Sequence, residues 1–228
     1  MAVSLGSLGI KGDIQANVRQ IYPHPKYDPK KYKNDIALLE LSEDLIFSQN
    51  LSRIPIDSSR ITPNQLVIAA GWGQTESKHL SPQLLQVTLR TAPNQICRRD
   101  RPGFRSHNGP QICTGGTPGK DTCPGDSGGP LLTKERESSM KLLGVTSFGT
   151  FTSATGFRCG DDTLGYFTHV AYHMMFIKQV TKLNDSQLLS ASPYVNFHSN
   201  LGLHASMKIP TSCYLILLVL VSAYLFHI

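Results

Sequence analysis

The stretch KDTCPGDSGGP, residues 120–130, places one serine, Ser127, between small residues. A serine hydroxyl is a weak nucleophile at neutral pH, so catalysis needs an aligned base and a group that receives the developing oxyanion. Glycines let the backbone turn sharply and approach a substrate, so the N–H groups of Gly125 and Ser127 can converge on one oxygen. The stretch predicts a nucleophile beside an oxyanion hole. A tight glycine-rich turn with an incidental serine is the alternative interpretation.

The composition is that of a globular protein. The chain has 228 residues, 40% hydrophobic and 17% charged, which is enough for one domain of ordinary size or two small lobes. The formal net charge of +6 raises the possibility of nucleic-acid binding, but no zinc-finger, helix-turn-helix or aromatic RNA-binding signature accompanies it, so we expect none. The densest basic stretch, residues 97–101, is either an exosite for acidic partners or a solvated loop. We expect no metal site and no cofactor.

Short apolar or alternating runs separated by Gly, Pro and Asn dominate the chain. They predict strands at residues 36–41, 66–70, 85–89, 141–148 and 166–170. A helical pattern follows only after Val170, and we expect Met174, Met175 and Phe176 to belong to the core. The predicted fold class is therefore all-β, with a C-terminal helix.

Four motifs occur in an order and spacing that resemble the trypsin/chymotrypsin-like serine endopeptidases, over about residues 20 to 184. They are NDIALL (34–39), AGWG (70–73), GDSGGP (125–130) and SFG (147–149). The resemblance implies a trypsin-like double β-barrel. It also implies Ser127 as the nucleophile, and Asp35 as the buried carboxylate that fixes the tautomer of a catalytic histidine and supports the imidazolium.

The resemblance also implies a substrate pocket. Asp121 falls at the floor of this pocket, where a confined carboxylate would select Arg or Lys before the scissile bond. Gly149 and Gly165 fall on its walls and leave room for a long cation. The segment Ser147, Phe148 and Gly149 is similar to the one that pairs with the substrate backbone as an added strand. The expected partners are proteins or peptides cleaved after Arg or Lys, and protein inhibitors.

The cysteines and sequons indicate an extracellular or cell-surface protein. Five cysteines suggest two disulfides and one odd thiol, and Asn50 and Asn184 begin acceptor sequons for N-glycosylation. The resemblance implies the pairs Cys97–Cys113 and Cys123–Cys159. Nine residues separate Gly149 from Cys159, more than is usual in the family, so we expect an enlarged pocket rim.

The catalytic base is missing from the expected place. The family's histidine lies in an Ala-Ala-His-Cys-like stretch upstream of the aspartate, and the only histidine before Asp35 is His24, in a Tyr-Pro-His-Pro segment where His-Pro is common without catalytic duty. An Ile-Val-Gly-Gly type N-terminus, whose ammonium pairs with the carboxylate matching Asp126, is also absent, as is a readable signal peptide. We expect an N-terminally truncated, inactive family member. The alternatives are a non-catalytic homologue that acts as a binding module and an isoform without function.

The expected organisation has four parts. Residues 1–55 are the remnant of an incomplete first barrel, residues 56–184 the second barrel with its terminal helix, and residues 185–210 a polar spacer. Residues 211–228 form an apolar tail that is short for a membrane span. A GPI-anchor signal, a short tail anchor and a buried terminal helix are the three interpretations of this tail, and the first two imply membrane association.

Overall fold

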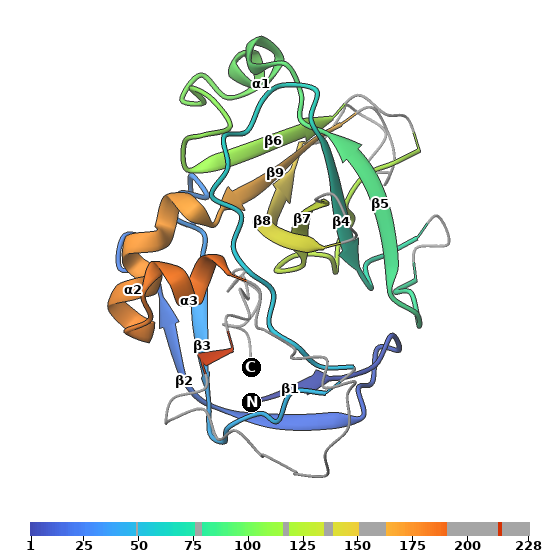
Figure 1. Ribbon diagram of the computed structural model, residues 1–228. Coiled ribbons are helices and arrows are strands. Elements are labelled where there is room, and N and C mark those ends of the chain that lie inside the picture. Colours follow the sequence, from blue (N-terminus) through green and yellow to red (C-terminus); the bar gives the residue numbers. More distant parts are fainter. Residues whose placement is uncertain are drawn as a thin grey trace, which may run out of the picture.

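The computed structural model describes residues 1–48, 50–75, 79–115, 119–134, 139–150, 163–190 and 214–215. These residues form two antiparallel β-sheets and a few short helices, with one sheet below the other in Figure 1 and helices α2 and α3 alongside. The predicted all-β class with a C-terminal helix is confirmed. No helix in these ranges is long and apolar enough to cross a membrane.

The first sheet has the strand order β1-β2-β3-β10. Its strands are β1 (Ala2–Leu5), β2 (Ile14–Pro23), β3 (Ala37–Leu41) and β10 (Tyr214–Leu215). Strand β3 is apolar and almost entirely buried, as the compact run at 36–41 predicts. A small core of Val3, Ala16, Leu39 and Leu41 lies on one face of the sheet.

The second sheet has six strands in the order β5-β4-β7-β8-β9-β6. They are β4 (Leu66–Gly71), β5 (Leu85–Arg90), β6 (Gln111–Gly115), β7 (Pro130–Lys134), β8 (Met140–Gly149) and β9 (Leu164–His169). The sheet curls until its two outer strands approach, where an isolated bridge joins Thr91 to Thr114. Inside lies a core that includes Leu131, Leu143 and Phe167, none of which has exposed surface. The Ser127 loop immediately precedes β7, so this core positions it.

The helices close the fold on one side. After the 3-10 turn η2 (Ala171–His173), helix α2 (Met174–Thr181) buries Phe176 and Ile177 against Ile36 and Leu38, which belong to the first sheet and its lead-in. Met175 is 73% exposed, so the expectation that it belongs to the core is wrong. One helical turn cannot direct three consecutive side chains to the same face, because each is rotated by about 100° from the last.

Two further helices were not predicted. Helix α1 (Asn94–Asp100) precedes β6, and helix α3 (Asp185–Leu189) occupies the first five residues of the predicted spacer. The side chain of Asn184 caps α3 by accepting a hydrogen bond from the Gln187 N–H, and Leu188 is buried in the same cluster as Phe176. The packed part of the chain therefore extends beyond residue 184.

The two sheets also meet through loops. The indole N–H of Trp72 donates to the carbonyl of Leu8 at 3.1 Å, and the amide of Leu84 donates to the same carbonyl at 2.6 Å. The amide of Ile10 donates to the carbonyl of Pro82 at 3.1 Å. These bonds attach the hairpin of β1 and β2 to the loop between β4 and β5.

Candidate active site

The Ser127 loop is held in a conformation that requires glycine. Gly125 and Gly128 have φ angles of +97° and +83°, which side chains of L-residues rarely adopt. The amide of Asp126 donates to the carbonyl of Cys123, and the amide of Gly128 donates to the carbonyl of Thr146 in β8. The amides of Gly125 and Ser127, by contrast, donate to no other described residue. Among the described residues, the N–H groups of Gly125 and of Ser127 itself are therefore free.

Ser127 itself is exposed. Its hydroxyl makes no hydrogen bond to any residue that the structure describes. No histidine therefore lies in hydrogen-bonding contact with it within those ranges.

Asp126 makes backbone hydrogen bonds with both carboxylate oxygens. Its Oδ1 accepts from the Gly73 amide at 2.7 Å, and its Oδ2 accepts from the Cys123 amide at 2.8 Å. A Cβ added at Gly71 would lie 2.0 Å from Oδ1, and one at Gly73 would lie 2.4 Å from Cγ, so the carboxylate fits only against glycine. The resemblance implies an N-terminal ammonium as the compensating charge for this carboxylate. The two amide donors supply part of that compensation.

A cavity of about 560 Å³ opens beside the same carboxylate. It is lined by residues 69–71 of β4, 73–75, 85–87 of β5, 119–123 and Asp126. Asp121, the predicted floor of the substrate pocket, is among the lining residues, whereas Ser127, Gly149 and Gly165 are not, so this cavity shares Asp121 with the predicted pocket.

Asp35 precedes β3 and is 4% exposed. Its Oδ2 accepts a hydrogen bond from the Ser147 hydroxyl at 2.6 Å, and its backbone carbonyl accepts one from the Thr168 hydroxyl at 2.7 Å. Burial raises the pKa of Asp35 to about 6, although the hydrogen bond from Ser147 opposes this. The Asp35 carboxylate thus contacts β8, and no positively charged group among the described residues pairs with it.

The end of β8 has an edge that no described residue pairs with on one side. Strand β7 pairs with β8 as far as Pro130 and Val145, and Thr146 still exchanges bonds with Gly128 and Gly129. Beyond this point β8 pairs only with β9 among the described residues, through Phe148–Tyr166 and Gly149–Gly165. The segment from Ser147 to Gly149 can therefore accept another strand beside the Ser127 loop.

Asp121 and Gly165 lie together. A Cβ at Gly165 would come within 3.3 Å of Asp121 Oδ1, so a side chain there would crowd the carboxylate. Asp121 accepts hydrogen bonds from the Thr122 amide at 2.7 Å and from the Thr163 hydroxyl. Burial raises the pKa of Asp121, these hydrogen bonds lower it, and the charge of Asp126 raises it further, with a net increase. On the paired strand, a Cβ added at Gly149 would meet no described atom closer than Leu164 O, at 3.8 Å, so there is space beside this glycine.

His24 packs against the helices and not against Asp35. Its ring centroid lies 5.3 Å from that of His173 and 4.8 Å from that of Phe176, and its Nδ1 accepts from the Lys26 amide at 3.1 Å. Burial and the charge of Lys26 lower the pKa of His24. No hydrogen bond joins this ring to Asp35 or Ser127 in the described ranges.

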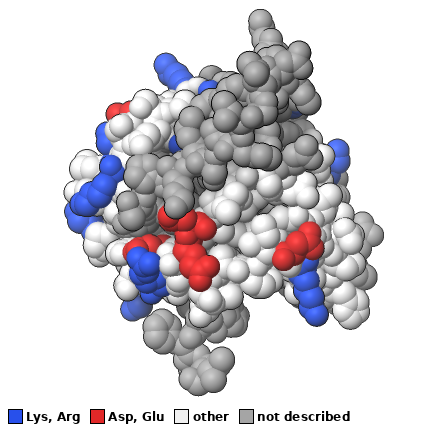
Figure 2. All heavy atoms as spheres, turned by 60° about the horizontal axis from the view of Figure 1, so that its bottom comes forward, with Lys and Arg blue, Asp and Glu red and all other residues white. Residues whose placement is uncertain are grey.

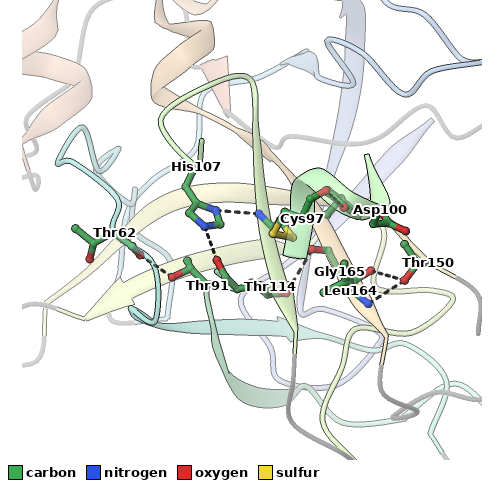
Figure 3. The surroundings of a disulfide bond; sticks show 12 residues. Thr62, Thr91, Cys97, Asp100, His107, Thr114, Thr150, Leu164 and Gly165 are labelled. Atoms are coloured by element: carbon green, nitrogen blue, oxygen red, sulfur yellow. Dashed lines mark hydrogen bonds between the residues drawn. A yellow bond between two sulfur atoms is a disulfide. The ribbon is translucent and has the colours of Figure 1, made fainter. Parts of the chain in front are cut away.

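The disulfide Cys97–Cys113 connects α1 to β6, as the resemblance implies. Beside it lies His107, which the sequence did not single out (Figure 3). Its Nδ1 accepts from the Cys113 amide at 3.3 Å, and its Nε2 lies 2.8 Å from the carbonyl of Ala92, so the ring connects two backbone segments. Burial lowers the pKa of His107, and this neutral ring has a structural role.

The structure describes only some of the remaining predicted sites, which are the second disulfide, the pocket rim and the two sequon asparagines. Cys123 is disulfide-bonded, but its expected partner Cys159 and the long rim at 151–158 lie outside the described residues, as do most of the spacer and tail. Asn50 is exposed, and Asn184 is exposed while capping α3. No group of three or more His, Cys, Asp or Glu side chains is placed to hold a metal ion in the described ranges.

Comparison with known proteins identifies the family. The family model for trypsin matches residues 3–177. The chain is 35% identical to CLIP domain-containing serine protease B4 of Anopheles gambiae, over 72% of this chain and 46% of the relative. It is 36% identical to trypsin-1 of Astacus astacus, over 71% of this chain and 65% of the relative, and 32% identical to mouse transmembrane protease serine 11G, over 73% and 39%. The chain thus spans about half or less of the length of several relatives that it matches. With the match covering most of the sequence, this chain belongs to the trypsin family of serine proteases.

Proposed function

We propose that the site is that of a serine endopeptidase that cleaves peptide bonds after Arg or Lys. The observation that carries the proposal is the buried Asp35 carboxylate, held by the Ser147 hydroxyl at the start of the free edge of β8. A carboxylate costs free energy when it is buried without a positive partner, so its retention is understandable if it supports an imidazolium during catalysis. In this scheme Ser127 is the nucleophile, and the amides of Gly125 and Ser127 stabilise the oxyanion.

The Arg or Lys preference rests on Asp121. Its half-buried carboxylate lies beside Gly165, close to the β8 edge where the substrate backbone would pair. A guanidinium or ammonium that reached this carboxylate would gain an ion pair in a confined site. Binding of benzamidine, a small aromatic cation, tests this role without requiring catalysis. We expect Asp121→Asn to weaken binding at least about tenfold, since a charged hydrogen bond is worth about 1.5–3 kcal/mol, and Asp13→Asn, an exposed control, to leave it unchanged.

We further propose that this chain by itself has little hydrolytic activity. His24 packs against Phe176 of α2, so it is not placed to act as the base of Ser127. Removal of the histidine from such a triad lowers turnover by a factor of about 10⁶. Labelling with a fluorophosphonate probe measures the reactivity of Ser127 directly, with Ser127→Ala as the control. Little or no labelling is expected, and rapid stoichiometric labelling would contradict inactivity while supporting the assignment of the nucleophile.

The second candidate is a binding module that holds a peptide strand without cleaving it. The edge from Ser147 to Gly149, which no described residue pairs with on one side, and the exposed Ser127 both suit this function. An Arg-containing peptide that binds, competes with benzamidine and remains intact would favour this candidate. Cleavage of the peptide would exclude it.

A further inference from the structure

The net charge of the chain is concentrated in two short segments. Residues 26–33 contain four lysines and one aspartate, and residues 98–105 contain four arginines and one aspartate. Together they carry +6, which equals the formal net charge of the whole chain, so all other residues together are neutral. Figure 2, by contrast, shows a face on which acidic and basic side chains are interspersed.

The fold places these two segments side by side. The guanidinium of Arg101 donates to the backbone carbonyl of Lys31 at 2.7 Å. Tyr32 stacks on Phe148 with ring centroids 4.7 Å apart, and the Arg101 guanidinium lies 4.6 Å from the centroid of the same Phe148 ring. The side chain of Gln111 also donates to the Tyr32 carbonyl, at 2.9 Å. We call the eight cations of these segments the basic patch; they are Lys26, Lys30, Lys31, Lys33, Arg98, Arg99, Arg101 and Arg105.

The cations of the basic patch have no acidic partners among the described residues. None of them forms an ion pair in the described part of the chain. Of the two aspartates in these segments, Asp28 accepts from the amides of Lys30 and Lys31, and Asp100 accepts from the Tyr166 hydroxyl at 2.7 Å. All eight cations except Arg101 are exposed. Like charges gathered in this way repel one another, and they attract anions from solution.

The backbone beneath the patch is fixed in place. Arg98 and Arg99 follow Cys97, whose disulfide to Cys113 attaches α1 to the barrel, as Figure 3 shows. The Arg98 guanidinium donates to the Arg105 carbonyl at 3.1 Å, so its orientation is set before a ligand arrives. Preorganised donors lose less conformational entropy on binding.

We propose that the basic patch binds a sulfated polysaccharide. Seven of the eight cations are exposed, and none of them lines the cavity of about 560 Å³, which fits a linear ligand that carries anions along its length. Half of them are arginines, whose planar guanidinium binds oxyanions through two N–H groups. The disulfide places the chain in an oxidising compartment, where such polysaccharides occur outside the cell. This inference does not depend on Asp121 or Ser127.

The test uses the full chain and heparin as the probe, with affinity measured at 0.1 M NaCl and at higher salt. We expect Arg98→Ala/Arg99→Ala and Lys30→Ala/Lys31→Ala each to weaken binding about 30-fold, because each cation facing an anionic surface contributes about fivefold. Lys11→Ala/Lys134→Ala removes the same charge from exposed positions outside the patch and should change affinity less than about threefold. Thermal unfolding midpoints confirm that the variants fold.

Three results would overturn the proposal. The first is an equal loss in the Lys11/Lys134 control, which would indicate attraction by overall charge alone. The second is undiminished binding of desulfated heparin. The third is tighter binding of poly-glutamate or of single-stranded DNA, which would assign the patch to an acidic protein or to a nucleic acid. Asp121→Asn should leave heparin affinity unchanged, so this outcome is separate from that of the benzamidine experiment.

Discussion

Replacement of Asp35 by asparagine should change how the stability of the protein depends on pH. Burial raises the pKa of Asp35 from 3.8 to about 6, so the folded state binds a proton at this site that the unfolded state does not bind between those two values. The stability of the wild type therefore rises, through this group, as the pH falls from about 6 to about 4. A shift of about two units corresponds to about 3 kcal/mol.

The asparagine variant lacks this titration. Its carbonyl can still accept from Ser147, but its buried NH₂ group costs about 1–3 kcal/mol if it finds no acceptor. This cost does not depend on pH. We therefore expect Asp35→Asn to be similar to the wild type or up to about 2 kcal/mol more stable at pH 7.5, and about 1–3 kcal/mol less stable at pH 4.

Urea unfolding of both proteins, followed by circular dichroism from pH 4 to 7.5, measures this difference. Asp57→Asn is a matched control, because Asp57 is equally buried at 5% exposure but has the opposite pKa shift. Burial raises the pKa of Asp57, but hydrogen bonds from Ser59 and Thr133 and the charge of Lys141 outweigh it and lower the pKa. Its contribution to stability is lost as the pH falls. A constant difference between Asp35→Asn and the wild type at every pH would refute the reasoning, since it would mean that burial does not disfavour the Asp35 charge.

Three further predictions concern other parts of the fold. Burial, together with the charges of His24 and His169, lowers the pKa of His173 to about 4. The free energy of unfolding therefore falls by about 3 kcal/mol through this group as the pH falls from 6.5 to about 4. His173→Phe should remove that loss in the same urea titration. Gly73→Ala should destabilise by about 2 kcal/mol, because its Cβ would overlap the Asp126 carboxyl, whereas Gly103→Ala, which meets no atom within 4 Å, should not change the thermal unfolding midpoint. Asn184→Ala should cost about 1 kcal/mol through loss of the α3 cap, and Asn184→Asp, which keeps an acceptor oxygen, should retain most of that stability in chemical denaturation.

The strands were predictable from the sequence because their burial follows simple patterns. The run at 36–41 became β3, and the alternation at 85–89 became β5, although Leu85 remains 50% exposed. The first helix was not predictable in the same way. Helix α1 buries only Cys97 and has no side-chain cap at its start, so it lacks both an apolar stripe and a start signal.

Helix α3 did have a readable signal. Asn184 followed by Gln187 three positions later forms a capping box, in which each side chain bonds the backbone of the other residue. The polar composition of the region that follows concealed this signal. The predicted boundary at residue 184 was therefore placed before a helix that packs Leu188 into the core.

At the candidate site, sequence motifs identified residues but not their partners. The contact of Asp126 with Gly73 joins positions 53 residues apart, and that of Asp35 with Ser147 joins positions 112 apart. Such contacts depend on how the strands are arranged in space, which local patterns do not specify. The catalytic roles of Asp35, Ser127 and Asp121 stay predictions until the experiments above are done.

Trp72 offers an intrinsic optical reporter. It is the chain's single tryptophan, and its indole N–H bonds the Leu8 carbonyl across the junction between the β1–β2 hairpin and the second sheet. Separation of that hairpin would break the bond and expose the half-buried indole further to water, and the emission maximum should shift to longer wavelength. Detachment of the amino-terminal hairpin could then be followed by fluorescence without any attached dye, while the disulfide-linked barrel remains folded.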